Sequence, residues 1–344
     1  MKELDNIYNY TLHDLEEYFT NMSIKPYVAK QIYEQLYKSK ITNPKDMQYI
    51  SKKVINDLQK NFTFSTLVLA QKQEDKLVKK YLFSLSDNQT IESVLMYHDY
   101  GRSLCISSQV GCNMGCAFCQ SGKLKKVRNL APHEMVEQVL YIEKDIGEKI
   151  SHVVIMGIGE PFDNYDNVMK FIKIINTPQG INIGSRHITI STCGIVPKIK
   201  QFTEENTQIN LAISLHASND KIRNELMPIN KVYNLSKLIA SIKEYIKATN
   251  RRVTFEYIML KDVNDNSTYA HELARLLKNI NCYVNLIPYN QTENNLFFRS
   301  ENNKIMKFYD ILKKEKINVT IRKEFGSKVN AACGQLRANN LQGG

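Results

Sequence analysis

Residues 111–122 read GCNMGCAFCQSG and place three thiols, Cys112, Cys116 and Cys119, within eight residues. Soft thiolates select zinc, copper(I) or iron–sulfur clusters. A structural zinc site is closed by four ligands, and this stretch holds no histidine and no second pair of cysteines. A four-iron cluster held by three cysteines leaves one iron open to another ligand. The stretch therefore predicts an iron–sulfur cluster with an open coordination position.

Short β-rich runs alternate with helical stretches after this loop. Strands are predicted at residues 103–107, 152–156, 187–192, 210–215, 252–259 and 283–289, with helices such as 132–146, 164–176, 235–248 and 267–279 between them. Alternating strands and helices form right-handed parallel βα units. Six units fit an incompletely closed barrel better than the full eight-unit one. We therefore predict an α/β fold, a partial (β/α)6 barrel, with a late strand at 319–322 beside it.

The unusual residues of this region follow the predicted strands, where barrel enzymes carry their chemistry. The thiols follow the first strand, GIGEP (157–161) the second, STCG (191–194) the third, SLH (214–216) the fourth and YN (289–290) the sixth. We expect these five segments to meet at one rim. Gly157 and Gly159 are expected to permit the GIGEP backbone turn.

The first part of the chain has a different pattern. Residues 25–39 carry apolar side chains on one helical face, with Pro26 suited to a first turn. Asn43 and Ser51 are predicted N-caps. Strands and turns follow up to Tyr97. We predict three parts: a helical and hairpin RNA-recognition module at 1–95, the barrel at 96–325, and a C-terminal loop at 326–344.

Charge and cysteine content bound the possible functions. The net charge is +11, and residues 1–100 hold 13 lysines, no arginine and 13 acids, so the whole excess lies in residues 101–344. That excess suggests a polyanionic substrate, although a lysine-rich composition without a partner explains it equally well. The chain has neither a long apolar run nor a signal peptide, so we expect a cytoplasmic protein that does not enter membranes.

The seven cysteines favour metal or catalytic thiols over a disulfide framework in this compartment. Buried cysteine is usually a small apolar residue, which would suffice for Cys105, Cys193 and Cys282. Cys333 lies between small residues in NAACGQL, and we expect this loop to be accessible and its thiol nucleophilic. On pattern alone, Glu92 is a strand glutamate that faces solvent.

Longer stretches extend the similarity beyond single motifs. The cysteine spacing C-x-x-x-C-x-x-C, with Phe118 before the last cysteine, resembles that of radical S-adenosylmethionine (SAM) enzymes. LCISSQVGC, MGIGEPF, ISTCGIVP, AISLHA, MPIN, VNLIPYN and NAACGQLR resemble, nearly in register, the RlmN family of dual-specificity rRNA and tRNA adenine methyltransferases. The resemblance runs from about residue 20 to residue 338.

The resemblance implies one [4Fe–4S] cluster held by Cys112, Cys116 and Cys119, and two SAM molecules per turnover. One SAM methylates Cys333; the second yields a 5′-deoxyadenosyl radical that abstracts hydrogen from that methyl group. The carbon radical adds to adenine, Cys105 attacks Cys333 to form a transient disulfide, and Glu92 acts as the base. The SAM contacts that the resemblance implies are Gly159, Glu160, Ser191, Ser214, Leu215, His216 and Asn290.

The implied substrates are an adenine of 23S rRNA and an adenine of the tRNA anticodon loop, both methylated at C2. An external electron donor, such as a flavodoxin-like protein, and a monomeric state complete the expectation. Two alternatives stay open: a Cfr-type enzyme that methylates C8 and confers antibiotic resistance, and a non-catalytic metal-containing RNA-binding protein. The loop QSGKLKKVRNL departs from the family pattern, and its basic residues either contact RNA phosphates or form a solvated turn.

Overall fold

One ten-stranded sheet forms the frame of the computed structural model, which describes residues 4–290 and 296–322. Its strand order is β14-β13-β12-β11-β10-β9-β6-β5-β4-β3. The strands span β3 Val68–Asp75, β4 Val78–Ser84, β5 Thr90–His98, β6 Gly101–Ile106, β9 His152–Ile155, β10 Ile188–Thr192, β11 Asn210–Ser214, β12 Val253–Met259, β13 Cys282–Pro288 and β14 Val319–Ile321.

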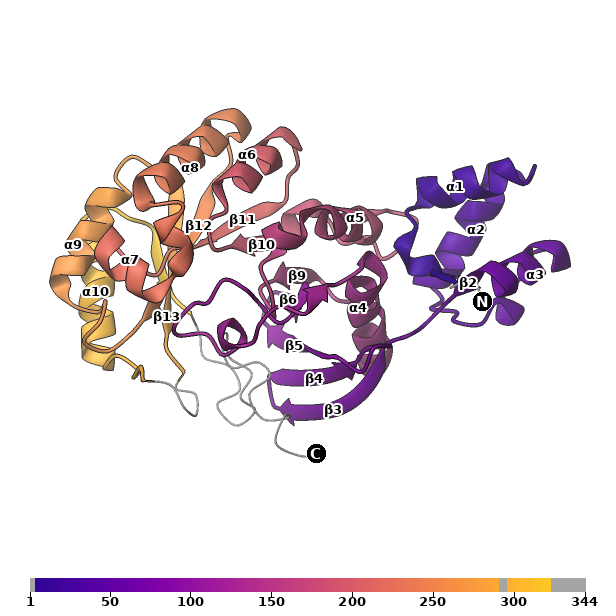
Figure 1. Ribbon diagram of the computed structural model, residues 1–344, viewed down its shortest axis with the longest axis horizontal. Helices are drawn as coiled ribbons and strands as arrows, with labels where there is room; N and C mark the ends of the chain where they lie inside the picture. The colour runs from indigo at the N-terminus through magenta and orange to yellow at the C-terminus, as the bar shows by residue number, and fades with distance from the viewer. Residues whose placement is uncertain (1–3, 291–295, 323–344) are drawn as a thin grey trace.

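The six predicted barrel strands are confirmed and run parallel, from β6 through β9 to β13. The late strand β14 pairs parallel with β13, as predicted. Helices α4 Pro132–Ile146, α5 Tyr165–Asn176, α6 Val196–Glu204, α7 Asp220–Leu226, α8 Leu235–Thr249, α9 Ser267–Leu276 and α10 Asn302–Lys314 connect or follow them. Figure 1 shows the helices gathered on the outer side of the sheet, as a partial barrel requires.

The strands before the barrel belong to the same sheet. β3, β4 and β5 run antiparallel, and β5 joins β6 with Val94 opposite Cys105. The hairpin expected within residues 1–95 therefore extends the barrel sheet, and position 95 falls inside β5. Because these strands are continuous with the barrel, the three-part division of the chain stays a proposal.

The N-terminal helices form as their sequence signals predict. They are α1 Leu12–Asn21, α2 Pro26–Tyr37 and α3 Lys52–Asn61. Pro26 is the first residue of α2, the Ser51 hydroxyl accepts a hydrogen bond from Val54 N–H, and the Asn43 side chain accepts one from Lys45 N–H. The predicted apolar face of α2 is buried.

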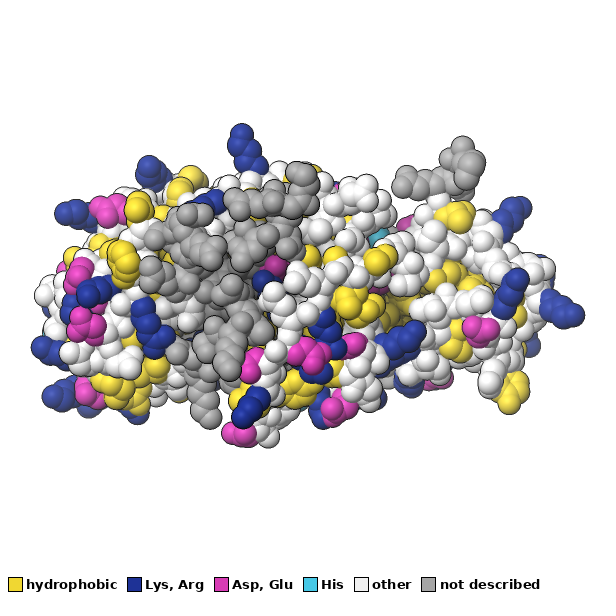
Figure 2. All heavy atoms as spheres, turned by 90° about the horizontal axis from the view of Figure 1, so that it is seen from below, with side chains coloured by type: hydrophobic (Ala, Val, Ile, Leu, Met, Phe, Trp, Pro, Cys, Tyr) yellow, Lys and Arg dark blue, Asp and Glu magenta, His cyan; other side chains and the backbone are white. Residues whose placement is uncertain are grey.

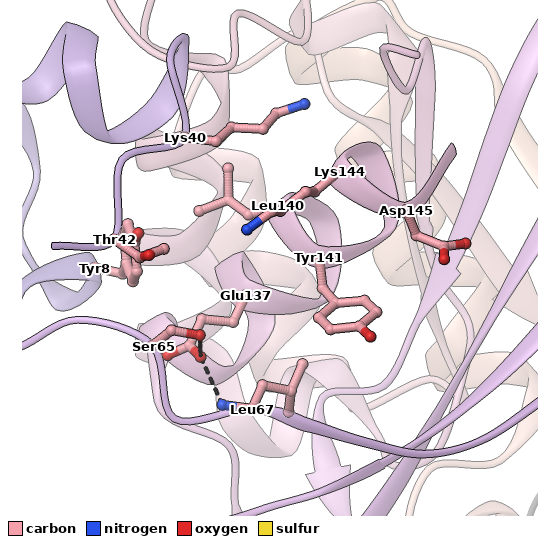
Figure 3. A pocket seen from close by; sticks show the side chains of 10 residues that line it. All are labelled: Tyr8, Lys40, Thr42, Ser65, Leu67, Glu137, Leu140, Tyr141, Lys144 and Asp145. Carbon is pink, nitrogen blue, oxygen red and sulfur yellow. Dashed lines mark hydrogen bonds between the residues drawn. The ribbon is translucent and has the colours of Figure 1, made fainter. Parts of the chain in front are cut away.

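This helical group lies beside α4 and α5 (Figure 1), and one buried carboxylate secures the chain between it and the barrel. Glu137, on α4, accepts hydrogen bonds from the backbone N–H groups of Thr66 and Leu67 at 2.7 and 2.8 Å, and from the Asn6 amide at 3.0 Å. Figure 3 shows this carboxylate at the wall of a cavity of about 410 Å³, with the Leu67 bond dashed. Glu137 thus joins the start of the chain, the connecting segment and the barrel.

The surface shown in Figure 2 carries Lys and Arg side chains interleaved with acidic ones at both ends of the molecule. The charged side chains coloured in this view are therefore spread out rather than gathered into one block. Within residues 4–290 and 296–322, no helix combines the length and apolar character needed to cross a membrane.

Replacing Glu137 tests its role as a connector. Glu137→Ala removes the acceptor of buried N–H groups, and an unsatisfied buried donor costs about 1–3 kcal/mol. We expect the free energy of unfolding, measured in urea, to fall by about 3 kcal/mol. Glu137→Gln keeps one acceptor oxygen and should lose less. Glu17→Ala, on the exposed side of α1, is the control and should stay within about 0.5 kcal/mol of wild type; equal losses in both alanine variants would contradict the role.

Candidate active site

Four of the five predicted rim segments line one cavity of about 150 Å³. Its wall includes Cys112, Cys116, Cys119, Gly159, Glu160, Ser191, Ser214 and His216. The fifth segment contributes Tyr289, which packs with Phe118 in a small apolar cluster beside the thiols. Leu215 is buried in the main core, and neither it nor Asn290 is among the residues that line this cavity. The topology therefore brings most, but not all, of the predicted set to one place.

Backbone bonds fix the thiol loop at this rim. Cys112 N–H donates to Leu124 O at 3.0 Å, Cys119 N–H to Cys116 O at 3.1 Å, and Ala117 N–H to Leu226 O of α7 at 2.9 Å. Burial raises the pKa of the Cys112 thiol to about 12 and that of Cys116 well above its usual value. Thiolates in such surroundings need the positive charge of a bound metal.

The donor set fits a cluster. Within residues 4–290 and 296–322, no three His, Cys, Asp or Glu side chains converge as ligands of a single ion. In a four-iron cube the cysteines bind different irons, so their sulfurs need not meet at one point. Gly122 leaves room for this loop to close, since a Cβ there would stand 2.9 Å from Cys116 O. The three thiols on one cavity wall therefore suit the cluster better than a closed zinc site.

The GIGEP turn lies directly against the strand that leads into the thiol loop. A Cβ on Gly157 would stand 2.6 Å from Ile106 O, and a Cβ on Gly159 would stand 2.6 Å from the Gln109 Cβ. Gly159 also has φ +110°, which disfavours other residues. The expectation that both positions require glycine is confirmed. Gly157 N–H completes the contact by donating to Ile106 O at 3.0 Å.

Glu160 holds the end of that turn in place. Its carboxylate accepts from Phe162 N–H at 3.0 Å and from Cys193 N–H at 2.8 Å, which ties the second strand's loop to the third's. Burial raises the pKa of Glu160, and these hydrogen bonds oppose the rise. The carboxylate therefore organises the rim backbone as well as facing the cavity.

His216 lies at the end of β11 with its ring edge-on to Phe118, the centroids 4.9 Å apart. Its Nδ1 accepts a hydrogen bond from Ile258 N–H at 3.1 Å, so the ring proton resides on Nε2. Burial, and to a smaller extent the charge of Arg223, lowers the pKa of His216 to about 3. The imidazole is thus neutral and can donate one hydrogen bond from Nε2.

Glu92 and Cys105 lie on the inner face of neighbouring strands. Cys105 is paired with Val94, and Glu92 is two residues from Val94, so the two side chains are diagonal neighbours on that face. The expectation from pattern alone that Glu92 faces solvent is wrong: it is 3% exposed, and the Lys80 ammonium lies 3.0 Å from its carboxylate. Period-two alternation could not reveal this, because both faces of β5 are buried.

Two basic residues of the loop after the thiols are held by acids. Lys126 contacts Asp163 at 2.7 Å. Arg128 forms a bidentate pair with Glu134, both bonds 2.8 Å, and a further bond to Asp87 at 2.7 Å. These two side chains brace the loop. Lys125 is exposed and stays a candidate for phosphate contact.

Two buried charged residues near the cavity were not predicted from the sequence. Glu256, on β12, lines the cavity and accepts a hydrogen bond from the Asn285 amide at 2.8 Å. Arg223, on α7, is fully buried beneath the rim. An acid inside the apolar strand RVTFEYIM was a usable signal for Glu256. Arg223 gave none, since a charged residue in a short polar helix is ordinary.

The remaining cysteine predictions divide between described and undescribed parts of the chain. Cys193 and Cys282 are buried, as expected for small apolar residues. No disulfide joins any two cysteines of residues 4–290 and 296–322. Cys333 and the whole predicted loop 326–344 lie outside the described residues, so the predicted transient disulfide stays a proposal.

A matched pair of glycines tests the close contact at the GIGEP turn. Gly157→Ala places a Cβ against Ile106 O, whereas a Cβ at Gly184 meets nothing within 4 Å. We expect the first substitution to lower the free energy of unfolding by about 1–3 kcal/mol through overpacking, and the second to stay within about 0.5 kcal/mol. Urea unfolding measures both. A neutral Gly157→Ala would show that the turn has room to move.

Comparisons with known proteins agree with this arrangement. The radical SAM superfamily matches residues 106–274, and the ribosomal RNA large subunit methyltransferase N-terminal domain matches residues 5–63. A relative from Spiroplasma citri, named "Probable dual-specificity RNA methyltransferase RlmN", is 51% identical over 98% of both chains. One of the same name from Enterococcus faecalis is 48% identical over 98% of this chain and 97% of its own.

A solved structure is similar over nearly the whole chain. The crystal structure of a radical SAM methyltransferase from Sphaerobacter thermophilus superposes with a TM-score of 0.92 at 39% identity, covering 97% of this chain and 99% of that one. The likeness includes the N-terminal helices as well as the barrel. The chain therefore belongs to the RlmN family of radical SAM RNA methyltransferases.

Proposed function

We propose that this protein methylates C2 of an adenine in 23S rRNA and C2 of an adenine in the tRNA anticodon loop, with Cys333 as the methyl carrier. The observation that carries the proposal is one cavity that gathers three thiols, the glycine turn and the polar strand ends. Met156 lines this cavity and also packs against the apolar cluster that contains Cys105. Cys105 therefore lies close to the proposed cofactor site.

Cys112, Cys116 and Cys119 are the proposed ligands of a [4Fe–4S] cluster. When bound, this group supplies the electron that splits the sulfonium of SAM. We propose that Gly159, Glu160, Ser191, Ser214, Leu215, His216 and Asn290 hold SAM. Ser191, Ser214 and the Nε2–H of neutral His216 offer hydrogen bonds toward the cavity. Leu215 and Asn290 belong to the proposed set by family resemblance, and the cavity gives them no direct support.

C2 of adenine requires radical chemistry because it lies between two ring nitrogens, is electron-poor and has no lone pair. A polar transfer from a sulfonium methyl group therefore fails at this carbon. In the proposed reaction the methyl-derived carbon of Cys333 bonds to C2, and Glu92 accepts the C2 proton. The Cys105 thiolate then attacks the Cys333 sulfur, so that an S–S bond forms as the S–C bond breaks. The released carbon takes up a proton to become the methyl group, and the surplus electron passes to the oxidised iron–sulfur cluster. The Lys80 ammonium lies 3.0 Å from the Glu92 carboxylate and pairs with it as an opposite charge.

The same proposal includes the stoichiometry, the electron donor, the cellular location and the RNA contacts of the enzyme. Two SAM molecules are consumed per turnover, an external donor such as a flavodoxin-like protein supplies electrons, and the protein acts in the cytoplasm as a monomer. The N-terminal helices and the exposed Lys125 are candidates for RNA contact. A Cfr-type methylation of C8 is the alternative outcome within the same chemistry.

The position of the new methyl group tests the choice between C2 and C8. Reconstituted protein, reduced anaerobically with dithionite, is incubated with SAM and with 23S rRNA or tRNA lacking the modification. We expect 2-methyladenosine by mass spectrometry of the digested RNA, together with 5′-deoxyadenosine. Finding 8-methyladenosine would assign the Cfr-type activity. An intact cluster without 5′-deoxyadenosine would instead favour a non-catalytic RNA-binding protein.

The two thiols should have separable roles. Cys105→Ala leaves no thiol to release the crosslinked product, so a covalent protein–RNA adduct should accumulate. Cys333→Ala removes the carrier, so no adduct should form. Denaturing gel electrophoresis with labelled RNA measures both, and Cys282→Ala, a buried thiol away from the cavity, is the control. Equal adduct in the first two variants would refute the assignment.

A further inference from the structure

Arg223 is a fully buried arginine that reaches two segments of the rim at once. It donates to Cys193 O, after β10, at 2.7 Å, and to Ser214 O and Leu215 O, at the end of β11, at 3.2 and 3.1 Å. A fourth bond, 2.9 Å long, runs to the Asn230 side chain. The guanidinium thus fixes the backbone that presents the proposed SAM contacts.

The positive charge of this side chain is not balanced by a bonded acid. All four acceptors of Arg223 among the described residues are neutral groups. Asp220, three residues before Arg223 on the same helix, instead has its Oδ1 bonded to the Asn230 amide and to Leu235 N–H, both at 2.9 Å. A buried charge without a counter-charge is costly. A negative group near the Arg223 guanidinium would therefore stabilise it, and the four hydrogen-bond acceptors do not provide one.

The thiol loop lies next to the helix that carries Arg223. Leu226 O accepts the hydrogen bond from Ala117 N–H at 2.9 Å. Leu226 and Met227 pack in one apolar cluster with Phe118, Cys116 and Cys119. Cys193, whose carbonyl oxygen Arg223 bonds at 2.7 Å, belongs to the same apolar cluster. Three thiolates outweigh the positive charge of an oxidised four-iron core, so the proposed cluster is a net anion that gains charge on reduction.

We propose that Arg223 is a positioning residue that supplies the buried counter-charge of the cluster and holds the ends of β10 and β11 for SAM. The inference rests on the proposed function, because it requires the cluster at the three thiols. A fixed positive charge in a dry site favours the reduced, more negative cluster, and net charge and hydrogen bonding set the potentials of such clusters. Arg223 thus makes the first electron transfer easier and keeps the SAM site in shape.

The test measures the equilibrium constant for one-electron reduction of the cluster in the absence of SAM and RNA. The cluster is titrated with dithionite, and its reduced form is followed by electron paramagnetic resonance. In Arg223→Gln we expect the equilibrium constant for reduction to fall about tenfold, which is about 59 mV for a one-electron couple. Lys221→Gln removes an exposed charge of the same helix and should change the constant less than about twofold, because solvent and salt screen it. An unshifted Arg223→Gln overturns the inference.

Arg223→Lys separates the effect of the positive charge from the effect of the hydrogen bonds to the rim. It also keeps the inference testable if the glutamine variant fails to hold a cluster. Lysine keeps the charge but cannot bond all three carbonyls, so its reduction constant should stay within about threefold of wild type. SAM affinity, measured by equilibrium dialysis, should fall about tenfold. A tenfold loss in the reduction constant, or unchanged SAM affinity, contradicts the inference. Wild type without a cluster, or without SAM cleavage, would instead contradict the proposed function.

Discussion

The close approach of two backbone segments at the top of β6 and β9 is the constraint on which the site depends. Gly157 and Gly159 lie so near Ile106 and Gln109 that neither can carry a side chain. This contact seats the GIGEP turn against the segment that leads into the thiol loop. Because both segments continue parallel strands of one sheet, their position is set by the sheet register.

Buried polar groups then complete the rim from three directions. Glu160 bonds the loop after β10, Arg223 bonds the ends of β10 and β11, and His216 accepts a bond from β12. Each of these side chains pairs with backbone N–H or C=O groups, so together they fix the strand ends of the rim. Such pairing offsets the cost of burying polar groups and places the proposed SAM contacts with little freedom.

The neighbours of three buried carboxylates separate their chemical roles. Glu92 pairs with the Lys80 ammonium, whereas desolvation raises the pKa of Glu256, a rise that Arg322 and Asn285 oppose. Glu137 does not line the active-site cavity and instead joins the N-terminal helices to α4. Three acids that look alike in the sequence therefore serve as proposed base, cavity wall and connector.

The sequence by itself determined the barrel strands, the helix caps, the glycine requirement and the thiol triplet, because each depends on local spacing and on the chemistry of a few adjacent residues. Only the tertiary structure decided the burial of Glu92, the membership of β3 to β5 in the barrel sheet and the clamp made by Arg223. These features arise between segments that are far apart in the chain. The burial and the electrostatic environment of such residues depend on neighbours that a local sequence pattern cannot identify.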